Sequence, residues 1–219
     1  MSGRETAPDE RKTVADTLRA LVDRNLTRGT SGNVSIRSAK GMLITPTGMT
    51  PGRLLPEHIV AMSLDGQAAE EQLIPSSEWQ MHADVYREKP EVAAIVHCHS
   101  PYATILACAG RSIPPLHYMV AAADSRNIPL APYATFGSKE LSRCNLDALS
   151  ASKACLLANH GQLATGKNLD EALKLADLVE ELAHCYWGTL CIGEPQLLGD
   201  AQMEDVERAF TTYGQQKES

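Results

Sequence analysis

Two short apolar runs, each reaching a histidine, constrain the fold of this chain most. Residues 92–97 read VAAIVH, and residues 154–158 read ACLLA and are followed by Asn159 and His160. Uninterrupted apolar runs of this length are typical of strands that are buried on both faces of a sheet, because buried helices are usually longer. The sequence therefore predicts at least two buried strands, with a histidine at or just beyond the end of each.

Further helix and strand patterns fill the rest of the chain. The helical segments carry apolar residues three and four positions apart and are bounded by capping residues, proline or glycine. The predicted helices cover residues 8–29, 75–90, 101–108, 138–149 and 168–193, with a short helix around Val206 and Phe210. The other predicted strands cover residues 33–37, 41–45 and 59–64. No linker, repeat or low-complexity tract interrupts residues 1–219, so we expect one mixed α/β domain.

Composition excludes several classes of function. Of the 219 residues, 43% are hydrophobic and 21% are charged, which suits a globular protein with a sizeable core. The net charge is −7 without any run of lysine or arginine, so nucleic acid is not expected as a partner. No segment reaches the roughly 18 apolar residues of a spanning helix, and MSGRETAPDERK lacks the apolar core of a signal peptide. We therefore expect no membrane partner, a cytoplasmic location, and six reduced, buried cysteines.

His97 and His99 lie two residues apart at the end of the first buried strand. Side chains at positions i and i+2 of a strand point to the same face, so both imidazoles can converge on one point. His160 supplies a third nitrogen if the two buried strands are neighbours in one sheet. Three imidazoles suit a catalytic Zn²⁺ ion, which keeps a position for water, carboxylate or substrate. The alternative is that His97 and His99 are an inert, hydrogen-bonded pair at a strand end.

The remaining histidines and Cys98 are not expected to bind this metal. Successive side chains of a strand point to opposite faces, so the Cys98 side chain should point away from those of His97 and His99. The other histidines lie in unrelated patterns and are interpreted as surface or satisfied core residues: His58, His82, His117 and His184.

Glu78 lies near the start of the predicted helix 75–90, directly after Ser76 and Ser77, which are expected to cap it. The helix dipole favours negative charge there, so Glu78 is a candidate base, although Ser-Ser-Glu is also an ordinary capping signal. The same helix start can hold an anion with its hydroxyls and backbone N–H groups. Two loops of small, hydroxyl-bearing residues offer similar donors to a phosphate, at residues 30–33 and 45–48.

Seven segments, in this order, resemble the class II aldolase and adducin-head family: GTSGNVSIR, MLITPTGM, PSSEWQMH, VHCHS, IPPLHYM, APYATFG and ANHG. The resemblance spans nearly the whole chain. Within the family, PLHYMVAAA, APYATFG and the C-terminal TYG are similar to L-fuculose-1-phosphate aldolases, whereas Ser100-Pro101-Tyr102 is similar to the epimerase and decarboxylase branches. The resemblance implies a single three-layer α/β domain, with a largely antiparallel central sheet flanked by helices.

The resemblance also implies a site. The implied ligands of one zinc ion per subunit are Glu78, His97, His99 and His160. Glu78 would be both the resting ligand and the catalytic acid/base, and Tyr118 matches a tyrosine that reaches a neighbouring subunit's site as proton donor. Phe136 and Tyr213 match residues around the aldehyde, and a homotetramer with sites between subunits is implied. The implied phosphate-binding residues are Gly32, Asn33, Thr47, Gly48, Ser76 and Ser77.

The expected activity is that of a metal-dependent aldehyde-lyase, which reversibly cleaves a ketose 1-phosphate to dihydroxyacetone phosphate and an aldehyde. L-fuculose 1-phosphate and the related 5-deoxy- or 5-methylthio-pentulose 1-phosphates fit this expectation. Alternatives within the family are a sugar-phosphate 4-epimerase, a 3-oxo-tetronate 4-phosphate decarboxylase and a methylthioribulose-phosphate dehydratase. A non-catalytic, adducin-like scaffold domain and a purely structural zinc site are the alternatives of another class.

Overall fold

The computed structural model describes residues 8–69 and 71–211. Its strands are β1 (Asn33–Ser38), β2 (Gly41–Ile44), β3 (Val60–Met62), β4 (Ala94–Cys98), β5 (Leu130–Ala131), β6 (Ala154–Leu157) and β7 (Gly161–Gly166). Its α-helices are α1 (Pro8–Asp23), α2 (Trp79–Glu88), α3 (Pro101–Cys108), α4 (Lys139–Ala148), α5 (Leu169–Ile192) and α6 (Asp200–Phe210). Short 3-10 turns cover Pro51–Arg53, Pro56–His58, Tyr118–Ala123 and Leu149–Ala151.

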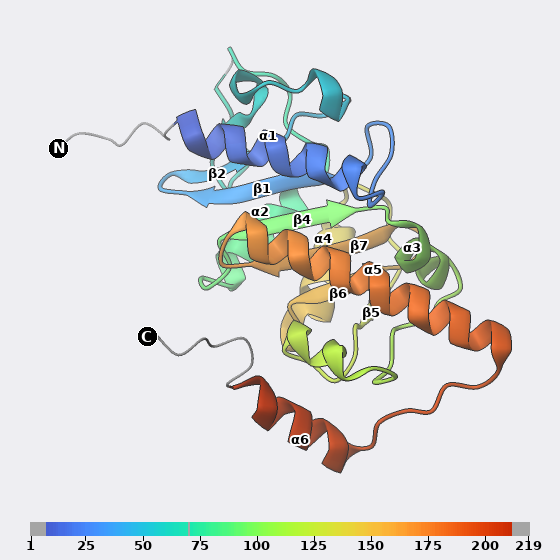
Figure 1. Ribbon diagram of the computed structural model, residues 1–219. Helices are drawn as coiled ribbons and strands as arrows, with labels where there is room; N and C mark the ends of the chain where they lie inside the picture. The colour runs from blue at the N-terminus through green and yellow to red at the C-terminus, as the bar shows by residue number, and fades with distance from the viewer. Residues whose placement is uncertain (1–7, 70, 212–219) are drawn as a thin grey trace, which may run out of the picture.

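The seven strands of the described chain form one sheet in the order β3-β2-β1-β4-β7-β6-β5. Every neighbouring pair is antiparallel except β5 and β6, which are parallel. The edge strand β3 is covered by Gln72, whose side-chain amide bonds both the N–H and the carbonyl of Ala61. Figure 1 shows helices packed around this sheet. The prediction of one α/β domain with a largely antiparallel sheet is confirmed.

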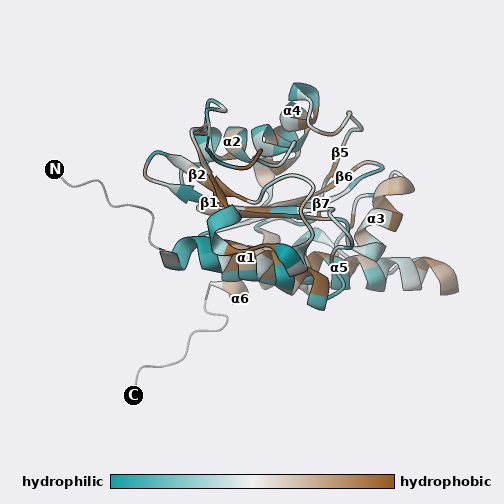
Figure 2. Ribbon diagram, turned by 90° about the horizontal axis from the view of Figure 1, so that it is seen from above, coloured by the Kyte–Doolittle hydropathy of each residue, from teal (hydrophilic) through white to brown (hydrophobic). Residues whose placement is uncertain are grey.

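Helices cover both faces of the sheet, because its central strands are apolar on both sides. Along β4, Val96 packs in a core cluster with residues of α1, α3, α5 and α6, whereas Ile95 packs with residues of α2 and α4. Figure 2 shows the same division, with α2 and α4 on one side of the sheet and α1, α5 and α6 on the other. The three-layer arrangement that the family resemblance implied is therefore present, and the two cores lie on opposite faces of the central strands.

Several predicted boundaries are wrong. Helix α1 ends at Asp23, well before residue 29, because Asn25 adopts a left-handed conformation (φ 57°) that a helix cannot continue through. Helix α2 begins at Trp79 instead of residue 75. The predicted serine cap is also wrong, because the N-cap residue is Glu78 and the Ser76 hydroxyl accepts from the Glu78 N–H (3.3 Å).

The strand β7 was not predicted, and it changes the order of the sheet. The two buried strands β4 and β6 are not neighbours, since β7 lies between them and pairs with both. A tight turn joins β6 to β7, in which Asn159 takes a left-handed conformation (φ 56°). The sequence of β7, GQLATG, lacks the unbroken apolar run by which β4 and β6 are recognised, because it contains polar and small residues. The short β5 was missed for a similar reason, since two residues leave no pattern.

The cysteines follow the prediction only in part. All six are free, and Cys98, Cys144 and Cys155 are buried. The other three are exposed at solvent-facing positions of α3 and α5, so burial was predicted wrongly for Cys108, Cys185 and Cys191. No helix in residues 8–69 and 71–211 is long and apolar enough to cross a membrane.

Gly161 should tolerate no side chain, because β7 starts there in close contact with the end of β4. A Cβ atom at Gly161 would lie 2.4 Å from the carbonyl oxygen of Cys98 and 3.0 Å from the His99 ring. We expect Gly161→Ala to lower the free energy of unfolding by about 1–3 kcal/mol, through forced displacement of packed backbone. Urea unfolding measures this change.

Gly188 offers a matched control for that substitution. It lies in α5, and a Cβ atom there would meet nothing within 4 Å. Gly188→Ala should therefore stabilise the chain by about 0.5–1 kcal/mol, because alanine is the better helix residue. Equal effects of the two substitutions would contradict the close approach at Gly161.

Candidate active site

Three strand ends meet at one edge of the sheet and carry the candidate ligands. Asn33 at the start of β1 pairs with His97 near the end of β4, and Cys98 pairs with Gln162 near the start of β7. His99 follows β4 directly, and His160 immediately precedes β7. The antiparallel pairing therefore brings together side chains that lie far apart in sequence. His97 and Gln162, for example, are 65 positions apart.

The imidazoles of His97, His99 and His160 face one another at this edge. Their ring centroids are 4.8–5.0 Å apart with interplanar angles of 71–81°, so each ring presents an edge to the other two. One ring nitrogen of each histidine lies within 4.8 Å of the others, and the Nε2 atoms of His97 and His99 are 3.2 Å apart. The predicted convergence of the three histidines is confirmed, although β7 and not β6 is the neighbour of β4.

Glu78 completes the cluster from the other layer. Its Oε2 atom lies 3.2 Å from His97 Nε2, and its Oε1 atom lies 3.2 Å from His160 Nε2. The carboxyl group is buried, with 7% of the residue exposed. Asn33 donates a hydrogen bond of 2.9 Å to Oε2, whereas Oε1 accepts none from the described residues. Glu78 therefore keeps one buried oxygen available at the centre of the cluster.

The charges of Glu78 and His97 stabilise each other in the metal-free protein. Burial would raise the pKa of the Glu78 carboxyl, but His97, His160 and Asn33 outweigh it and hold that pKa well below its usual range. Burial would likewise lower the pKa of His97, but the carboxylate and the carbonyl of Gln162 raise it. Without a metal ion, the proton on His97 thus supplies the positive charge that the buried carboxylate needs.

A divalent metal ion such as Zn²⁺ fits this set of donors. Two ligands at about 2.0–2.1 Å from a tetrahedral zinc ion lie roughly 3.3 Å apart, close to the 3.2 Å separations found here. His97 donates its Nδ1–H to the carbonyl of Gln162 (2.8 Å), which turns Nε2 toward the cluster. Oε1 of Glu78 accepts no hydrogen bond and lies 3.2 Å from His160 Nε2, so a cation bound between the two would satisfy this buried acceptor. Cys98 packs in the core on the opposite face, as predicted, and burial raises the pKa of its thiol to about 12.

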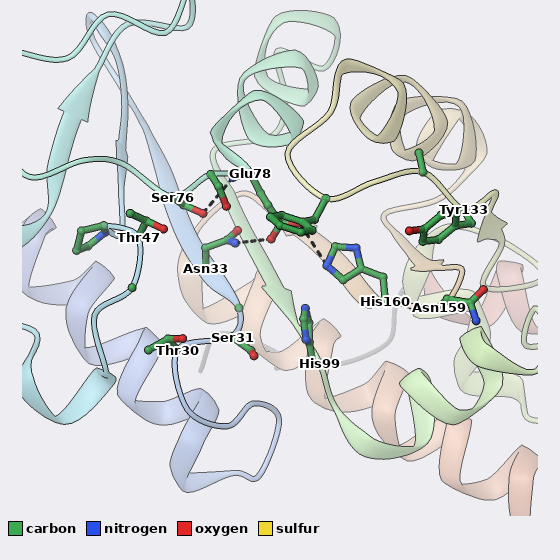
Figure 3. Close-up of a pocket in the computed structure, with 16 residues that line it drawn as sticks. Thr30, Ser31, Asn33, Thr47, Ser76, Glu78, His99, Tyr133, Asn159 and His160 are labelled. Carbon is green, nitrogen blue, oxygen red and sulfur yellow. Dashed lines mark hydrogen bonds and ion pairs between the residues drawn. The ribbon is translucent and has the colours of Figure 1, made fainter.

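The cluster opens into a pocket of about 540 Å³. Figure 3 shows Glu78, His99 and His160 between the loops that carry Thr30 and Thr47 and the segments that carry Tyr133 and Asn159, with dashed lines joining Glu78 to Asn33 and His160. Loops at residues 30–33, 46–48 and 76–77 carry mainly hydroxyl groups and glycine. The candidate residues that line the pocket are Gly32, Asn33, Thr47, Gly48, Ser76, Ser77, Glu78, Phe136, His99 and His160.

Two of the described candidate residues, Tyr118 and the fully buried His97, do not line this pocket. Tyr118 is 45% exposed, stacks on the ring of His117 with centroids 4.7 Å apart, and is not among the pocket residues of its own chain. Tyr213 lies outside the described residues. Gly32 has a structural role besides, since its φ of 80° suits glycine and a Cβ atom there would lie 2.9 Å from the His97 carbonyl oxygen.

The pocket also contains residues that sequence reasoning missed. Tyr133 lies in the same segment as Phe136, and Asn159 immediately precedes His160, so both were close to recognised motifs. Neither carried a signal of its own, since an aromatic residue and an asparagine in a loop have many roles. Thr30 and Ser31 line the pocket from the predicted phosphate loop. Gln162, whose carbonyl orients His97, gave no signal because any residue supplies a carbonyl.

The remaining histidines lie where predicted, on the surface or as hydrogen-bonded residues of the core. His82 is fully buried and both of its ring nitrogens have hydrogen-bond partners, so it is a satisfied core residue. His117 and His184 are exposed, and His58 is half-buried.

Comparison with known proteins identifies the family that this fold and site define. Residues 12–187 match the family described as Class II Aldolase and Adducin N-terminal domain. The chain is 48% identical over 199 residues to a 5-methylthioribulose-1-phosphate/5-deoxyribulose-1-phosphate aldolase of Rhodospirillum rubrum, covering 91% of this chain and 90% of that protein. It is 45% identical over 202 residues to the L-fuculose phosphate aldolase of Escherichia coli K12, covering 92% and 94%.

The fold agrees with the sequence comparison. A solved structure of an L-fuculose 1-phosphate aldolase superposes with a TM-score of 0.91 and 36% identity, covering 96% of this chain and 100% of that one. The cluster of three histidines on a three-layer α/β domain agrees with these matches. The chain belongs to the class II aldolase and adducin family.

The metal-free protein should lose stability in mild acid. Burial lowers the pKa of His82 and His99 to about 3 and that of His160 to about 4, all below the usual 6.5. The unfolded chain therefore binds more protons than the folded chain below pH 6.5, so the free energy of unfolding falls as the pH is lowered. The pKa of His97 is raised, so this histidine has the opposite effect on the free energy of unfolding. It offsets the effect of only one of the other three histidines.

Urea unfolding of the chelator-treated protein at several pH values from about 7 to about 5 measures this slope. We expect the midpoint to fall steadily as the pH falls. A midpoint that stays constant or rises on acidification would contradict the burial of these neutral imidazoles.

Proposed function

We propose that this protein is a zinc-dependent aldolase, which reversibly cleaves a ketose 1-phosphate to dihydroxyacetone phosphate and an aldehyde. The observation that carries the proposal is the convergence of three imidazoles and a buried carboxylate beside a pocket lined by hydroxyl-bearing loops. Relatives that are 45–48% identical are aldolases of sugar phosphates, which supports the same class of reaction here. We further propose one zinc ion per chain and a cytoplasmic location.

The pocket has two chemically different ends that suit such a substrate. Loops at residues 30–33, 46–48 and 76–77 offer hydroxyls and backbone N–H groups, which bind a phosphate without a lysine or arginine. The opposite end has Tyr133 (Figure 3), and Tyr133 and the pocket residue Phe136 are 64% and 68% exposed. We assign the first end to the phosphate and the second to the aldehyde. The metal ligands lie between them, where the carbon–carbon bond is cleaved.

Zinc, when held by His97, His99 and His160 with Glu78, supplies a Lewis acid that withdraws charge from the substrate ketone, worth several kcal/mol. The chain's own contribution is the movement of protons. Cleavage removes a proton from the hydroxyl that becomes the aldehyde oxygen and adds one to the carbon that becomes part of dihydroxyacetone phosphate. We assign the second transfer to Glu78, whose Oε1 is free of hydrogen bonds and close to the pocket. We assign the first to Tyr118 of a neighbouring subunit.

Glu78→Gln tests the proton transfer. The amide keeps the size and a ligand oxygen of the carboxylate but cannot act as a base, so the chain should still bind zinc at saturating zinc concentration, although with lower affinity because the ligand loses its charge. We expect kcat to fall by about 10²- to 10⁴-fold, the usual contribution of a positioned acid or base. Metal analysis and the release of dihydroxyacetone phosphate measure the two effects. Glu88→Gln, at the exposed end of α2, is the matched control and should retain full activity.

Substrate choice is decided by a panel assay. L-fuculose 1-phosphate, 5-deoxyribulose 1-phosphate and 5-methylthioribulose 1-phosphate should be compared for release of dihydroxyacetone phosphate. Turnover of a ketose phosphate without that release would favour an epimerase, decarboxylase or dehydratase.

Borohydride trapping of substrate on a lysine would establish a Schiff-base mechanism instead. A purified chain without stoichiometric metal would favour a scaffold domain, and unfolding on metal removal would favour a structural zinc site.

We also propose a homotetramer in which Tyr118 enters the pocket of a neighbouring chain. The supporting observation is that Tyr118 is half-exposed and does not line the pocket of its own chain. A catalytic centre that needs this hydroxyl is therefore incomplete in a single chain.

Complementation between two inactive variants tests the shared site. Tyr118→Phe lacks the proton donor, and His99→Asn lacks a metal ligand. Mixed oligomers formed by refolding the two together should regain activity, because some of their pockets combine an intact metal site with an intact tyrosine. Each variant refolded alone is the control, and absence of recovery in proven mixed oligomers would count against the shared site.

A further inference from the structure

A row of buried polar side chains runs from Glu78 into the core between α2 and the sheet. The sequence spaces them regularly: Glu78, His82 and Tyr86 lie four residues apart, and Asn33 and Ser35 lie two apart on β1. The first spacing places side chains on one face of a helix, and the second places them on one face of a strand. All five are buried, with exposed fractions between 0% and 7%. The two polar stripes therefore face each other where an apolar contact would be expected.

The five side chains form one continuous chain of hydrogen bonds. The Tyr86 hydroxyl lies 2.8 Å from Ser35 Oγ, and Ser35 Oγ lies 2.7 Å from His82 Nδ1. His82 Nε2 lies 2.5 Å from Asn33 Oδ1, and Asn33 Nδ2 lies 2.9 Å from Glu78 Oε2. No gap separates Glu78 from Tyr86, which is eight residues further along α2.

The direction of every bond follows from the carboxylate at its end. Glu78 Oε2 only accepts, so the Asn33 amide must present its N–H there and its oxygen to His82. His82 must then donate from Nε2, which leaves Nδ1 to accept from the Ser35 hydroxyl. The Ser35 oxygen in turn accepts from the Tyr86 hydroxyl. All donors therefore point toward Glu78, and His82 is a neutral imidazole with its proton on Nε2.

The orientation of Asn33 depends on this proton. With the proton on Nδ1, His82 would accept at Nε2, and the Asn33 amide would turn its N–H toward the histidine. The amide oxygen would then face the Glu78 carboxylate, and two acceptors would repel each other in a buried site. Both ends of the amide are engaged, so the histidine proton and the carboxylate orientation are linked through one side chain.

We propose that His82 is a positioning residue, which locks the Asn33 amide and thereby holds Oε2 of Glu78 while leaving Oε1 free for the reaction centre. The proposal rests on the proposed function only for the role of Glu78. Burial lowers the pKa of His82 to about 3, which is consistent with a ring that stays neutral while the site works. Core positions filled by polar groups are costly unless all are paired, so a purely structural core would be built more simply from apolar residues.

Substitutions at His82 test the lock against a merely structural role. His82→Gln keeps a donor and an acceptor at similar positions, whereas His82→Met fills the space without either. We expect His82→Met to lower kcat with KM unchanged, and to weaken Zn²⁺ binding, each by about 10- to 100-fold. His82→Gln should restore most of both. Zn²⁺ binding is measured by competition with a chelator and needs no substrate.

Val85→Ala is the matched control, because Val85 is a fully buried residue of the same helix outside the hydrogen-bond chain. It should lose stability while keeping kcat and Zn²⁺ affinity. Equal kcat and affinity in His82→Met and Val85→Ala would overturn the proposal. If His82→Met does not fold, Ser35→Ala replaces it: removing the hydroxyl that donates to Nδ1 should lower kcat and Zn²⁺ affinity in the same direction, and unchanged values would overturn the proposal.

The tautomer of His82 provides a readout independent of any activity. Nitrogen-15 NMR of histidine-labelled protein, with and without Zn²⁺, should show His82 protonated on Nε2 only, and Ser35→Ala should shift it toward the Nδ1–H form. The signal is assigned by its loss in His82→Gln. A wild-type His82 protonated on Nδ1, or on both nitrogens, would overturn the proposal. If the wild-type chain cleaves no ketose phosphate of the panel, the proposed function fails, while the tautomer and Zn²⁺ measurements still decide the role of His82.

Discussion

The rest of the site depends on the insertion of β7 between β4 and β6. An antiparallel strand at this place brings its N-terminal end beside the C-terminal end of β4, so residues before β7 lie next to residues after β4. The turn that places His160 there is short, and Gly161 allows β7 to approach β4 without a Cβ atom in the way. Backbone hydrogen bonding in the sheet therefore places His97 and the strand ends next to His99 and His160. A metal ion held by these side chains would inherit the rigidity of the sheet.

The second constraint is electrostatic. Glu78 places a carboxylate in a buried position, and a charge there is tolerated only with compensating charge or donors nearby. In the metal-free protein, the protonated His97 supplies the charge, the Asn33 amide donates a hydrogen bond, and His160 also lowers the pKa of Glu78. A divalent cation would replace the proton on His97 and satisfy the free oxygen of Glu78 as well. In the proposed function, this arrangement places a base beside a Lewis acid, and we propose that the buried polar side chains of α2 and β1 orient that base.

Sequence patterns predicted the elements that carry strong periodicity. The buried strands β4 and β6, the hairpin of β1 and β2, and the helices α3, α4 and α5 were all recognised, because apolar runs and capping residues are local signals. The strand β7 was not, since its glycine, glutamine and threonine residues resemble a loop and only pairing with two neighbours makes it a strand. The start of α2 was misplaced because Ser-Ser-Glu is a capping pattern, while tertiary contacts at Glu78 decide where the helix begins.

The sequence by itself determined which chemical groups this protein has: three histidines at strand ends, a glutamate near a helix start, and loops of small, hydroxyl-bearing residues. It also contains the spacing of four between Glu78, His82 and Tyr86 and of two between Asn33 and Ser35, although no sequence pattern indicated that these two sets pair. Only the tertiary structure decided that these groups meet, because their separation in space depends on strand order and register, which local patterns do not encode. It likewise decided that Tyr133 and Asn159 line the pocket, whereas Tyr118 lies outside the pocket of its own chain.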